Sequence, residues 1–369
     1  MIYYSVAEIH LNHLAYNLNQ IRKKVAPAEV MAVVKADAYG HGAIPITKRL
    51  VKEGVKYFAV ARIAEALELR NAGITENILI FGSLFPDEME MAIINDIQIT
   101  ITDMADIETA QEIAIKLSVY VKLHLNIDTG MGRVGVPYKK ARSAIIKISN
   151  IDHFKLEGIY THFASSDERD KTFAELQLKR FNTIIQEWAD HLPHRPIFHA
   201  SNSGAILDLP EAYFDMVRAG ISLYGHYPST DTSESIRLKQ VMTLKTKVSS
   251  TRRLPKGSSI SYGRKYFTDK ETSIAVLPIG YADGIHRAFI NLGEVIINGK
   301  LYPMVGTVTM DQIMVDIGDD PVKVGDDVIF WGDTPQGSLQ ATKVADKIDT
   351  ISYELCCGIT KRVPRIYID

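Results

Sequence analysis

Residues 30–55 read "VMAVVKADAYGHGAIPITKRLVKEGV" and decide the fold. The segment opens with an apolar, mostly β-branched run, which is typical of a buried strand. It closes, over residues 43–55, with apolar side chains at three- and four-residue intervals, the pattern of a helix with one buried face. Strand, loop and helix in this order predict one unit of a parallel sheet that is covered by helices.

The same unit recurs until about residue 225. Seven further apolar runs predict strands at residues 57–61, 77–82, 97–102, 119–127, 155–162, 196–200 and 214–218. Helix-like segments lie between them, for example at residues 63–73, 86–96 and 173–192. Eight units within about 200 residues favour a closed (β/α)8 barrel of the TIM type over an open, doubly wound sheet.

The pattern changes near residues 228–236, which are polar and rich in turn formers. Beyond them, strand-like runs such as residues 242–254 alternate with turns, and the pair Asn298-Gly299 is a strong hairpin signal. Helical pieces are expected near residues 340–359. This part of the chain is therefore predicted to be a mainly antiparallel β structure.

The change of pattern divides the chain into two predicted domains. The barrel is expected at residues 10–233 and the β-rich domain at residues 234–369. Residues 1–9 precede the first strand–helix unit and are expected to add a strand to the second domain. The predicted fold class is α/β, a (β/α)8 barrel followed by a mainly antiparallel β domain.

Composition excludes several classes of function. The 369 residues carry a formal net charge of −2, and lysine and arginine are scattered, so no nucleic-acid partner is expected. The only two cysteines, Cys356 and Cys357, are adjacent, which favours free thiols in a reducing compartment and offers no zinc spacing; no metal site is predicted. The N-terminus lacks the pattern of a secretory signal, and no apolar run reaches 18 residues, so we expect a cytoplasmic protein without membrane contact.

Several polar residues fall at the carboxyl ends of predicted strands, where barrels of this kind carry their function. Lys35 ends the first strand, His162 the sixth and Arg218 the eighth, while Ser203 and residues 220–221 lie in the loops that commonly bind phosphate. Taken singly, each has an ordinary structural explanation, such as a solvated lysine or a core histidine. Together, a lysine amine, a phosphate cradle and a partner for a ring nitrogen favour pyridoxal 5'-phosphate as cofactor.

The motifs that accompany these residues resemble those of one family, the alanine racemases. They occur in the family's order from Val30 to Tyr367, nearly the whole chain. The matching stretches are "AVVKADAYGHG", "NIDTGMGRVGV", "GIYTHFASSDE", "HASNSGA", "DMVRAGISLYG", "SISYGRKY", "IGYADG", "VGTVTMDQIMVDI" and "ISYELCCGITKRVPRIY".

This resemblance implies a homodimer with shared active sites that interconverts L- and D-alanine and supplies D-alanine for peptidoglycan. Lys35 would hold the cofactor as an aldimine and act as one catalytic base, and Tyr262 of the other subunit would be the opposing base. The implied cofactor-binding residues are Lys35, Tyr39, Arg133, His162, Ser203, Arg218, Gly220, Ile221 and Tyr353. The implied substrate-binding residues are Arg133, Tyr281, Met310 and Asp311.

Two bases suit this chemistry, because inversion of an α-carbon removes a proton from one face of the substrate's external aldimine and returns one to the other. Tyrosine has a reference pKa of about 10, so Tyr262 needs positive charge or hydrogen bonding nearby to act as a base. The pair His162–Arg218 is the candidate for that tuning. Arg218 opposite the ring nitrogen keeps its own charge, which makes the cofactor a weaker electron sink and favours racemisation over transamination.

One position departs from the family pattern. Many members carry a lysine seven residues before the arginine of "MGR", and carbamylation of that lysine orients the arginine. Here the position is Asn126, which cannot form a carbamate. Arg133 is therefore expected to be held by another group, such as a chloride ion or a water.

Particular residues also bear on other functions. An amino-acid decarboxylase of the same barrel group would lack Tyr262, and a cofactor carrier of that group would lack the β domain. A racemase that prefers serine is disfavoured only modestly by tyrosines at the entrance. The "GMGRVG" of residues 130–135 is a weak dinucleotide signal without a doubly wound sheet, and the histidines of "HLPH" at residues 191–194 fit surface positions better than a metal site.

Overall fold

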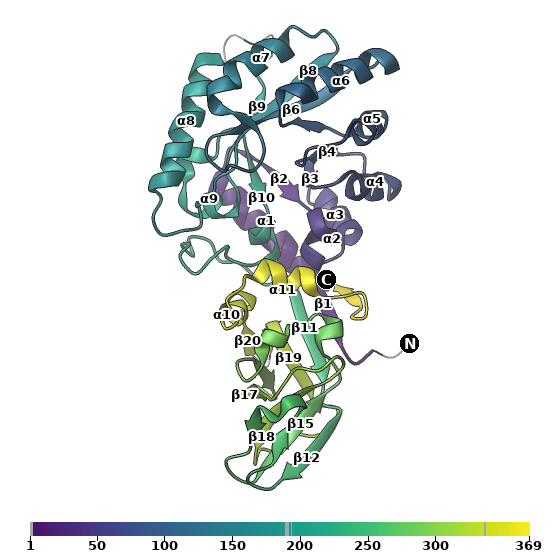
Figure 1. Cartoon of the computed structure of the whole chain (residues 1–369), viewed down its shortest axis with the longest axis vertical. Helices are drawn as coiled ribbons and strands as arrows, with labels where there is room; N and C mark the ends of the chain where they lie inside the picture. Colours follow the sequence, from purple (N-terminus) through teal and green to yellow (C-terminus); the bar gives the residue numbers. More distant parts are fainter. Residues whose placement is uncertain (1–2, 189–191, 193, 336) are drawn as a thin grey trace.

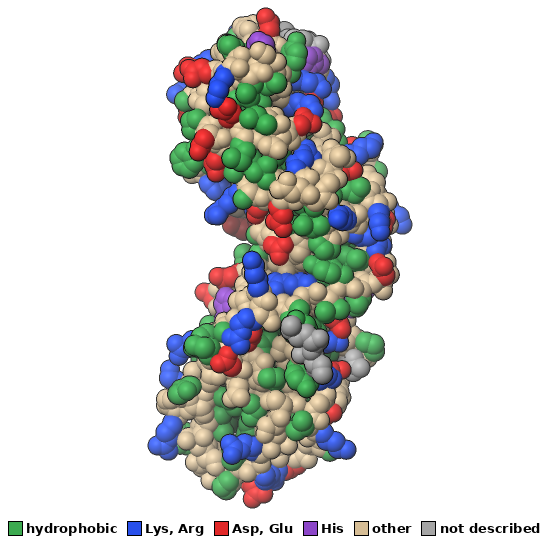
Figure 2. Space-filling view, turned by 90° about the vertical axis from the view of Figure 1, so that its right-hand side faces the viewer, with side chains coloured by type: hydrophobic (Ala, Val, Ile, Leu, Met, Phe, Trp, Pro, Cys, Tyr) green, Lys and Arg blue, Asp and Glu red, His purple; other side chains and the backbone are tan. Residues whose placement is uncertain are grey.

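The computed structural model describes residues 3–188, 192, 194–335 and 337–369. Two bodies lie end to end, with the barrel at one end and a sheet-rich body at the other (Figure 1). Among the described residues, no helix is long and apolar enough to cross a membrane. On the face shown in Figure 2, the surface is indented where the two bodies meet, and acidic, basic and hydrophobic side chains are intermixed rather than sorted by charge.

The first body is the predicted (β/α)8 barrel. Its eight strands are β2 (Glu29–Val33), β3 (Tyr57–Val60), β4 (Asn77–Ile80), β5 (Ile99–Ile101), β6 (Val121–Asp128), β8 (Phe154–Tyr160), β9 (Ile197–His199) and β10 (Met216–Ala219). They pair in parallel in the orders β10-β2-β3-β4 and β5-β6-β8-β9. A bridge between Leu79 and Gln98 joins the two groups on one side, and the Arg218 N–H donates to the Ser201 carbonyl at 2.9 Å on the other. All eight predicted strands are present, and the barrel is closed.

Helices cover the outside of the barrel. They are α3 (Ala43–Lys52), α4 (Ile63–Asn71), α5 (Pro86–Ile94), α6 (Met104–Leu117), α7 (Ala141–Ser149), α8 (Thr172–Trp188) and the short α9 (Ser203–Asp208). Helix α3 shows why they form, since its buried residues Ala43, Ile46, Thr47 and Leu50 repeat at helical spacing. Removal of this apolar face from water holds the helix against the strands.

The eighth outer position is filled from the start of the chain. Strand β10 is followed only by the short 3-10 turn η4 (Ile221–Tyr224), and the first helix, α1 (Leu11–Val25), packs against η4, β2, α3 and α9. The buried amide of Asn17 donates to the carbonyls of Leu223 and Lys239 at 3.1 and 2.8 Å. An N-terminal helix thus replaces the helix that strand β10 lacks.

The second body is mainly antiparallel. Its principal sheet runs β12-β15-β18-β17-β16-β19-β11-β1-β21, with β20 paired to β19. The strands are β1 (Val6–His10), β11 (Met242–Lys247), β12 (Ser250–Leu254), β15 (Thr272–Leu277), β16 (Glu294–Ile297), β17 (Lys300–Val305), β18 (Ile313–Gly318), β19 (Asp327–Thr334), β20 (Gly337–Leu339) and β21 (Arg365–Ile368), and the small pair β13 (Ser259–Ile260) and β14 (Tyr266–Phe267) lies apart. Strand β1 pairs antiparallel with β11 and parallel with β21, so the N-terminal residues do join this sheet.

The predicted hairpin and the terminal helices are also present. Strands β16 and β17 are joined by Asn298 and Gly299, whose φ angles of 51° and 78° suit a tight two-residue turn. Helices α10 (Ala341–Asp346) and α11 (Ser352–Gly358) follow the sheet. Helix α11 lies against the barrel so closely that a Cβ on Gly40 would come within 2.2 Å of the Cys356 carbonyl oxygen. This contact brings the C-terminal part of the chain to the mouth of the barrel.

Two further expectations concern the cysteines and the histidines of residues 191–194. Both cysteines are free, with Cys356 buried and Cys357 exposed, as predicted. The expectation for the histidines of residues 191–194 lies partly outside the described residues, because His191 and Pro193 are among those left out; His194 is exposed.

Candidate active site

A cavity opens at the carboxyl ends of the barrel strands. Nine residues that the sequence named as cofactor-binding line it: Lys35, Tyr39, Arg133, His162, Ser203, Arg218, Gly220, Ile221 and Tyr353. Eight come from the barrel, and Tyr353 comes from α11. Sequence reasoning missed other members of the lining, including Tyr160, Asp167, Asn202 and Pro228.

Lys35 begins a turn of unusual handedness. The next four residues, Ala36 to Tyr39, have φ angles of 52–54° and ψ angles of 40–53°, a left-handed helical turn labelled α2 (Lys35–Gly40). Left-handed helix costs L-residues roughly 1–2 kcal/mol each. Strain of this kind persists only where the surroundings enforce it, and it concentrates at functional sites. No periodicity in the sequence signals this turn.

Two carboxylates hold the turn. Glu65 accepts hydrogen bonds from the Ala36 N–H at 2.7 Å and from the Ala61 N–H at 2.8 Å. Asp37 accepts from the Ala43 N–H at 2.7 Å, where α3 begins. The turn is therefore tied to the next barrel unit and to its own following helix.

Lys35 has a lowered pKa. Burial is the main cause, and the positive charge of Arg133 adds to it, while Glu65 opposes it. A lower pKa raises the fraction of neutral amine, which is the nucleophilic and basic form. The cavity thus prepares Lys35 for reaction with a carbonyl compound or for proton abstraction.

Hydroxyl and backbone N–H groups among the lining residues form a candidate anion cradle. The Ser203 hydroxyl oxygen accepts hydrogen bonds from the N–H groups of Gly220 and Ser222 at 3.1 and 3.2 Å. A Cβ on Gly220 would meet the Tyr39 hydroxyl at 2.8 Å and lie 3.5 Å from the Ser203 hydroxyl, so glycine leaves open the space between these two groups. Hydroxyls and backbone N–H groups around such a space fit the phosphate of pyridoxal phosphate.

The aromatic rings around Tyr39 fix its position. Its ring lies 4.9 Å from that of Tyr224 and 5.9 Å from that of Tyr353, measured between centroids. The Tyr224 hydroxyl donates to the Val33 carbonyl at 2.9 Å. Burial raises the pKa of Tyr39, so its hydroxyl remains a proton donor suited to an anion.

Arg218 is buried and lines the cavity. Its guanidinium donates to the carbonyls of Thr161, His199 and Ala200 at 2.8–3.0 Å. It also lies 3.2 Å from the Nδ1 of His162, the neighbour that the sequence had proposed. Burial lowers the pKa of Arg218 to about 10, which still leaves it charged near neutrality. Arg218 can donate to a ring nitrogen but cannot accept a proton from it.

A buried chain of side chains continues behind Arg218. The guanidinium lies 3.1 Å from His199 Nδ1, His199 Nε2 lies 3.0 Å from His124 Nδ1, and His124 Nε2 lies 3.0 Å from the Gln98 oxygen. Because the guanidinium only donates and the Gln98 oxygen only accepts, both histidines must be neutral with the proton on Nε2. Burial and Arg218 lower the pKa of both imidazoles, that of His124 to about 3. Sequence reasoning missed these two histidines, although each stands in a barrel strand.

Arg133 lies on the exposed side of the cavity, in the loop after β6. Asn126 is buried beneath this loop, and its amide nitrogen lies 3.5 Å from the Val134 carbonyl oxygen. Gly135 packs on the same side chain, since a Cβ there would lie 3.2 Å from the Asn126 Cγ. Asn126 therefore supports the backbone of the loop that carries Arg133.

The remaining predicted residues lie elsewhere. Tyr262, Tyr281, Met310 and Asp311 belong to the second body and are not among the described residues that line the cavity. The Tyr262 side chain is 76% exposed, that of Met310 52% and that of Tyr281 41%. The structure thus gathers nine of the predicted site residues in one cavity and leaves these four on the surface.

Hydrogen bonds through residues 307–310 bring three of the four surface residues into one group. The Thr307 hydroxyl donates to the Tyr262 carbonyl at 2.8 Å, and the Tyr281 N–H donates to the Thr309 carbonyl at 3.0 Å. The Met310 carbonyl accepts from the Ala282 N–H at 3.1 Å. Residues 307–310 therefore connect Tyr262, Tyr281 and Met310.

Comparison with known proteins follows the same division of the chain. Residues 9–228 match the model of the alanine racemase N-terminal domain, and residues 241–367 match that of the alanine racemase C-terminal domain. Alanine racemase 2 of Caldanaerobacter subterraneus subsp. tengcongensis is 43% identical, covering 98% of this chain and 94% of that protein.

Solved structures of alanine racemases also resemble this chain. That of an alanine racemase from Clostridium difficile has a TM-score of 0.92 at 40% identity and covers 100% of this chain and 96% of its own. That of an alanine racemase from Streptomyces lavendulae has a TM-score of 0.94 at 33% identity, with 100% and 98% covered. The similarity extends over both bodies of the chain.

Proposed function

The chain belongs to the alanine racemase family and is an isomerase, and from that premise we propose that it interconverts L- and D-alanine with bound pyridoxal 5'-phosphate. The observation that carries the proposal is the barrel cavity, whose lining includes a lysine of lowered pKa, an anion cradle and a buried guanidinium. These groups match the aldehyde, phosphate and ring nitrogen of the cofactor. When bound, the cofactor supplies an electron sink that acidifies the α-hydrogen of the amino acid.

Each group of the cavity has a proposed role. Tyr39, Ser203 and the backbone at Gly220 and Ile221 hold the phosphate, with Tyr353 closing the cradle from α11. Arg218 donates a hydrogen bond to the ring nitrogen, and His162 lies beside it. The chain of His199, His124 and Gln98 fixes the guanidinium from behind.

The proton transfers are assigned to two bases. Lys35 carries the proton on one face of the α-carbon, consistent with its lowered pKa. We assign the opposite face to Tyr262 of a second copy of the chain, because this residue is exposed on the second body and does not line its own chain's cavity. The working unit is therefore proposed to be a homodimer whose sites combine residues of both subunits.

Substrate selection is assigned to the rim. Arg133, which lines the cavity, is proposed to contact the cofactor and the substrate, and the partner subunit is proposed to contribute Tyr281, Met310 and Asp311. Asp311 pairs with Arg362 of its own chain at 2.8 Å, at the surface. Tyrosines at the entrance favour a small side chain such as that of alanine. We further propose that D-alanine made in the cytoplasm supplies peptidoglycan synthesis.

The test combines chirality with spectroscopy. Purified protein with added pyridoxal phosphate is incubated with L-alanine, and D-alanine is measured by chiral chromatography. Racemisation and a cofactor absorbance band that Lys35→Ala abolishes are expected. A band without D-alanine, with serine racemised instead, would redirect the substrate assignment. No cofactor binding would overturn the proposal.

A further inference from the structure

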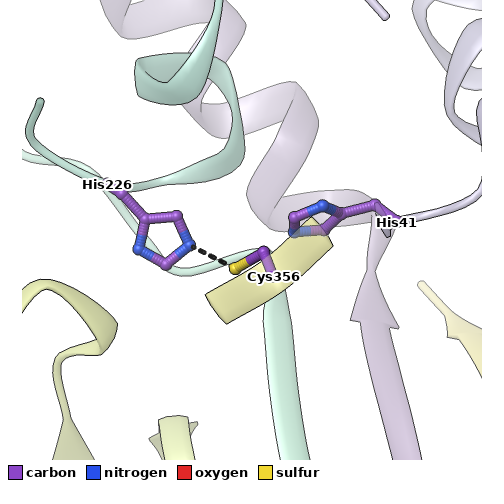
Figure 3. Close-up of side chains that lie close together, drawn as sticks. All are labelled: His41, His226 and Cys356. Carbon is purple, nitrogen blue, oxygen red and sulfur yellow. Dashed lines mark hydrogen bonds between the residues drawn. The ribbon is translucent and has the colours of Figure 1, made fainter. Parts of the chain in front are cut away.

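Three potential metal ligands meet in the interior beside the proposed active site. They are His41, which follows the turn α2, His226, which follows η4, and Cys356 on α11. Their candidate ligand atoms all lie within 4.8 Å of one another, and all three side chains are buried. Figure 3 shows Cys356 between the two imidazole rings. The three residues are far apart in sequence, so no ligand spacing announces them.

His41 presents a free ring nitrogen to this cluster. Its Nδ1 lies 3.0 Å from the Ala38 carbonyl oxygen and 2.8 Å from that of Tyr39, so Nδ1 carries the proton and donates. Its Nε2 is then a lone pair, and it has no hydrogen-bond partner among the described residues although the ring is fully buried. An imidazole oriented by a backbone carbonyl in this way is the usual arrangement of a metal ligand.

His226 and Cys356 complete the set. The Cys356 sulfur lies 3.7 Å from His226 Nε2. Bond lengths of about 2.3 Å for zinc–sulfur and 2.0–2.1 Å for zinc–nitrogen give sulfur–nitrogen separations of roughly 3.6 Å in a tetrahedral site.

We propose that His41, His226 and Cys356 form a binding site for a thiophilic metal ion, zinc(II) or copper(I). The thiol loses its proton to solvent when the sulfur–metal bond forms, and the two imidazoles each donate a lone pair, so one proton is released per ion bound. One thiolate and two imidazoles form a donor set that both ions accept. This replaces the expectation from motifs that the chain has no metal site, and it does not depend on the proposed function.

The net charge of the occupied site differs between copper(I) and zinc(II). With one thiolate, a copper(I) site is neutral, whereas a zinc(II) site carries one positive charge. Arg365 lies nearby, with its Nε donating to the Gly40 carbonyl at 3.0 Å, and its charge acts on both His41 and Cys356. This guanidinium favours the neutral copper(I) site, while zinc(II) requires a fourth ligand to complete its usual tetrahedron.

A bound ion would join three segments that build the active site. His41 directly follows the turn that carries Lys35 and Tyr39, and Cys356 is one helical turn from Tyr353. Ligation would therefore pin the lysine turn and the phosphate cradle to α11. Because the ion binds the folded chain and not the separated ligands, it should raise the melting temperature.

The first experiment measures metal content. The full-length protein is produced in medium supplemented with zinc or copper, purified under reducing conditions, desalted, and analysed by mass spectrometry for metals. About one ion per chain is expected in the native protein and in the matched control Cys357→Ser, which removes the adjacent exposed thiol. Cys356→Val and His226→Leu, which keep apolar volume but remove donors, should each reduce the content at least about tenfold.

A second measurement uses only the native protein and so does not depend on the folding of those variants. X-ray absorption of the native metal-loaded protein should show one sulfur neighbour at about 2.3 Å and nitrogen neighbours at about 2.0–2.1 Å for zinc. Stoichiometric metal with this signature supports the site. Native protein that retains no metal, equal metal in Cys356→Val, or a spectrum without sulfur would overturn it and leave a thiol–imidazole hydrogen bond.

Discussion

The two halves of the proposed active site differ in how completely one chain builds them. In the barrel, Arg218 is buried and surrounded by acceptors, and Ser203 is bound by two backbone N–H groups. On the second body, Tyr262 and Met310 expose more than half of their side chains. A single chain thus completes the proposed cofactor pocket but leaves the proposed second base, Tyr262, exposed on its surface.

The exposed segment around Tyr262 is nevertheless held by hydrogen bonds. The Ser261 hydroxyl donates to the Thr307 carbonyl at 2.7 Å, and the Thr307 hydroxyl donates to the Tyr262 carbonyl at 2.8 Å. Ser261 and Arg264 adopt positive φ angles of 64° and 50° on either side of Tyr262, a conformation that costs energy in residues other than glycine. A surface loop held in this way is prepared for a partner, which is why we place it in the site of a second subunit.

The largest expected effect comes from removing the nucleophile of the barrel half. Lys35→Ala should reduce racemisation by at least about 10³-fold, because a single side chain holds the cofactor and transfers protons. The measurement is D-alanine formation, together with the mass of the chain after borohydride reduction, which should show cofactor attached to the native protein only. Attachment in the variant would mean that another lysine serves, and the assignment of Lys35 would fall.

The next effect tests whether the exposed half belongs to a partner. Tyr262→Phe should lower activity about 10²–10⁴-fold while the cofactor stays bound, because only a proton-transfer group is lost. Mixing it with Lys35→Ala should restore activity if sites are shared, since each mixed dimer regains one native site. Equal, random exchange yields about a quarter of the native activity.

The control for subunit mixing is a double variant that carries both substitutions in one chain. Combined in equal amounts with native protein, it should lower the activity of the mixture from about half to about a quarter of the native value if sites are shared, because each mixed dimer then has no native site. Mixtures of the two single variants that stay inactive, although exchange is demonstrated with differently tagged subunits, would show that each chain uses its own Tyr262. The two halves would then belong to one site after all.

The buried and the exposed arginine of the cavity should contribute differently to the free energy of unfolding. Arg218→Met leaves the buried carbonyls of Thr161, His199 and Ala200 without their donor and should reduce the free energy of unfolding by about 3–5 kcal/mol. Arg133→Met, on the exposed side of the same cavity, should change it by no more than about 0.5 kcal/mol. Urea unfolding followed by circular dichroism measures both. Similar losses for the two variants would contradict the division into buried and exposed groups.

The sequence predicted those elements of the fold and those site residues that periodicity or a motif indicates. Alternation of apolar runs with helical spacing predicted all eight barrel strands, and Asn298-Gly299 predicted its hairpin, because these signals are local. The nine cavity residues came from strand ends and from the family's motifs rather than from contacts. Their meeting in one cavity depends on barrel closure, which only the structure displays.

Other features had no local signal. The left-handed turn after Lys35 uses ordinary residues such as Ala36 and Ala38, and Glu65 from the next unit enforces it. His124 and His199 looked like isolated strand residues, and only the parallel pairing of β6, β8 and β9 brings them within hydrogen-bond distance. Long-range contacts of this kind decide conformation and protonation where the local sequence is silent.

The buried histidines also predict a pH dependence of stability. Burial lowers the pKa of His124 to about 3, so below its ordinary value of 6.5 the unfolded chain binds a proton that the folded chain does not. Stability therefore falls as the pH drops from 6.5 toward 4, by about 1.4 kcal/mol per pH unit for this residue. His124→Gln should reduce the slope by that amount when urea midpoints are compared at pH 7, 6 and 5.

The matched control for this dependence is His194→Gln, which alters an exposed ring at the edge of the barrel. Comparison of the two variants tests whether the slope depends on the buried histidine in particular. If His124→Gln keeps the native slope, the interior accommodates a charged imidazole at this position, and the fixed proton order from Arg218 to Gln98 would be wrong.

The smallest effect on catalysis is expected at Asn126, a buried residue that supports the loop of the exposed Arg133. Asn126→Ala removes an amide only 3.5 Å from the Val134 carbonyl, a long hydrogen bond, so about 1 kcal/mol or less is lost. We expect the KM for alanine to rise about three- to fivefold, with kcat within about twofold of native, because the loop loosens while both proposed bases stay in place. Steady-state kinetics in both directions measure the two constants. A tenfold fall in kcat at constant KM would show that Arg133 acts during proton transfer rather than in binding. An exposed residue of the barrel half would then be positioned as strictly as the buried ones.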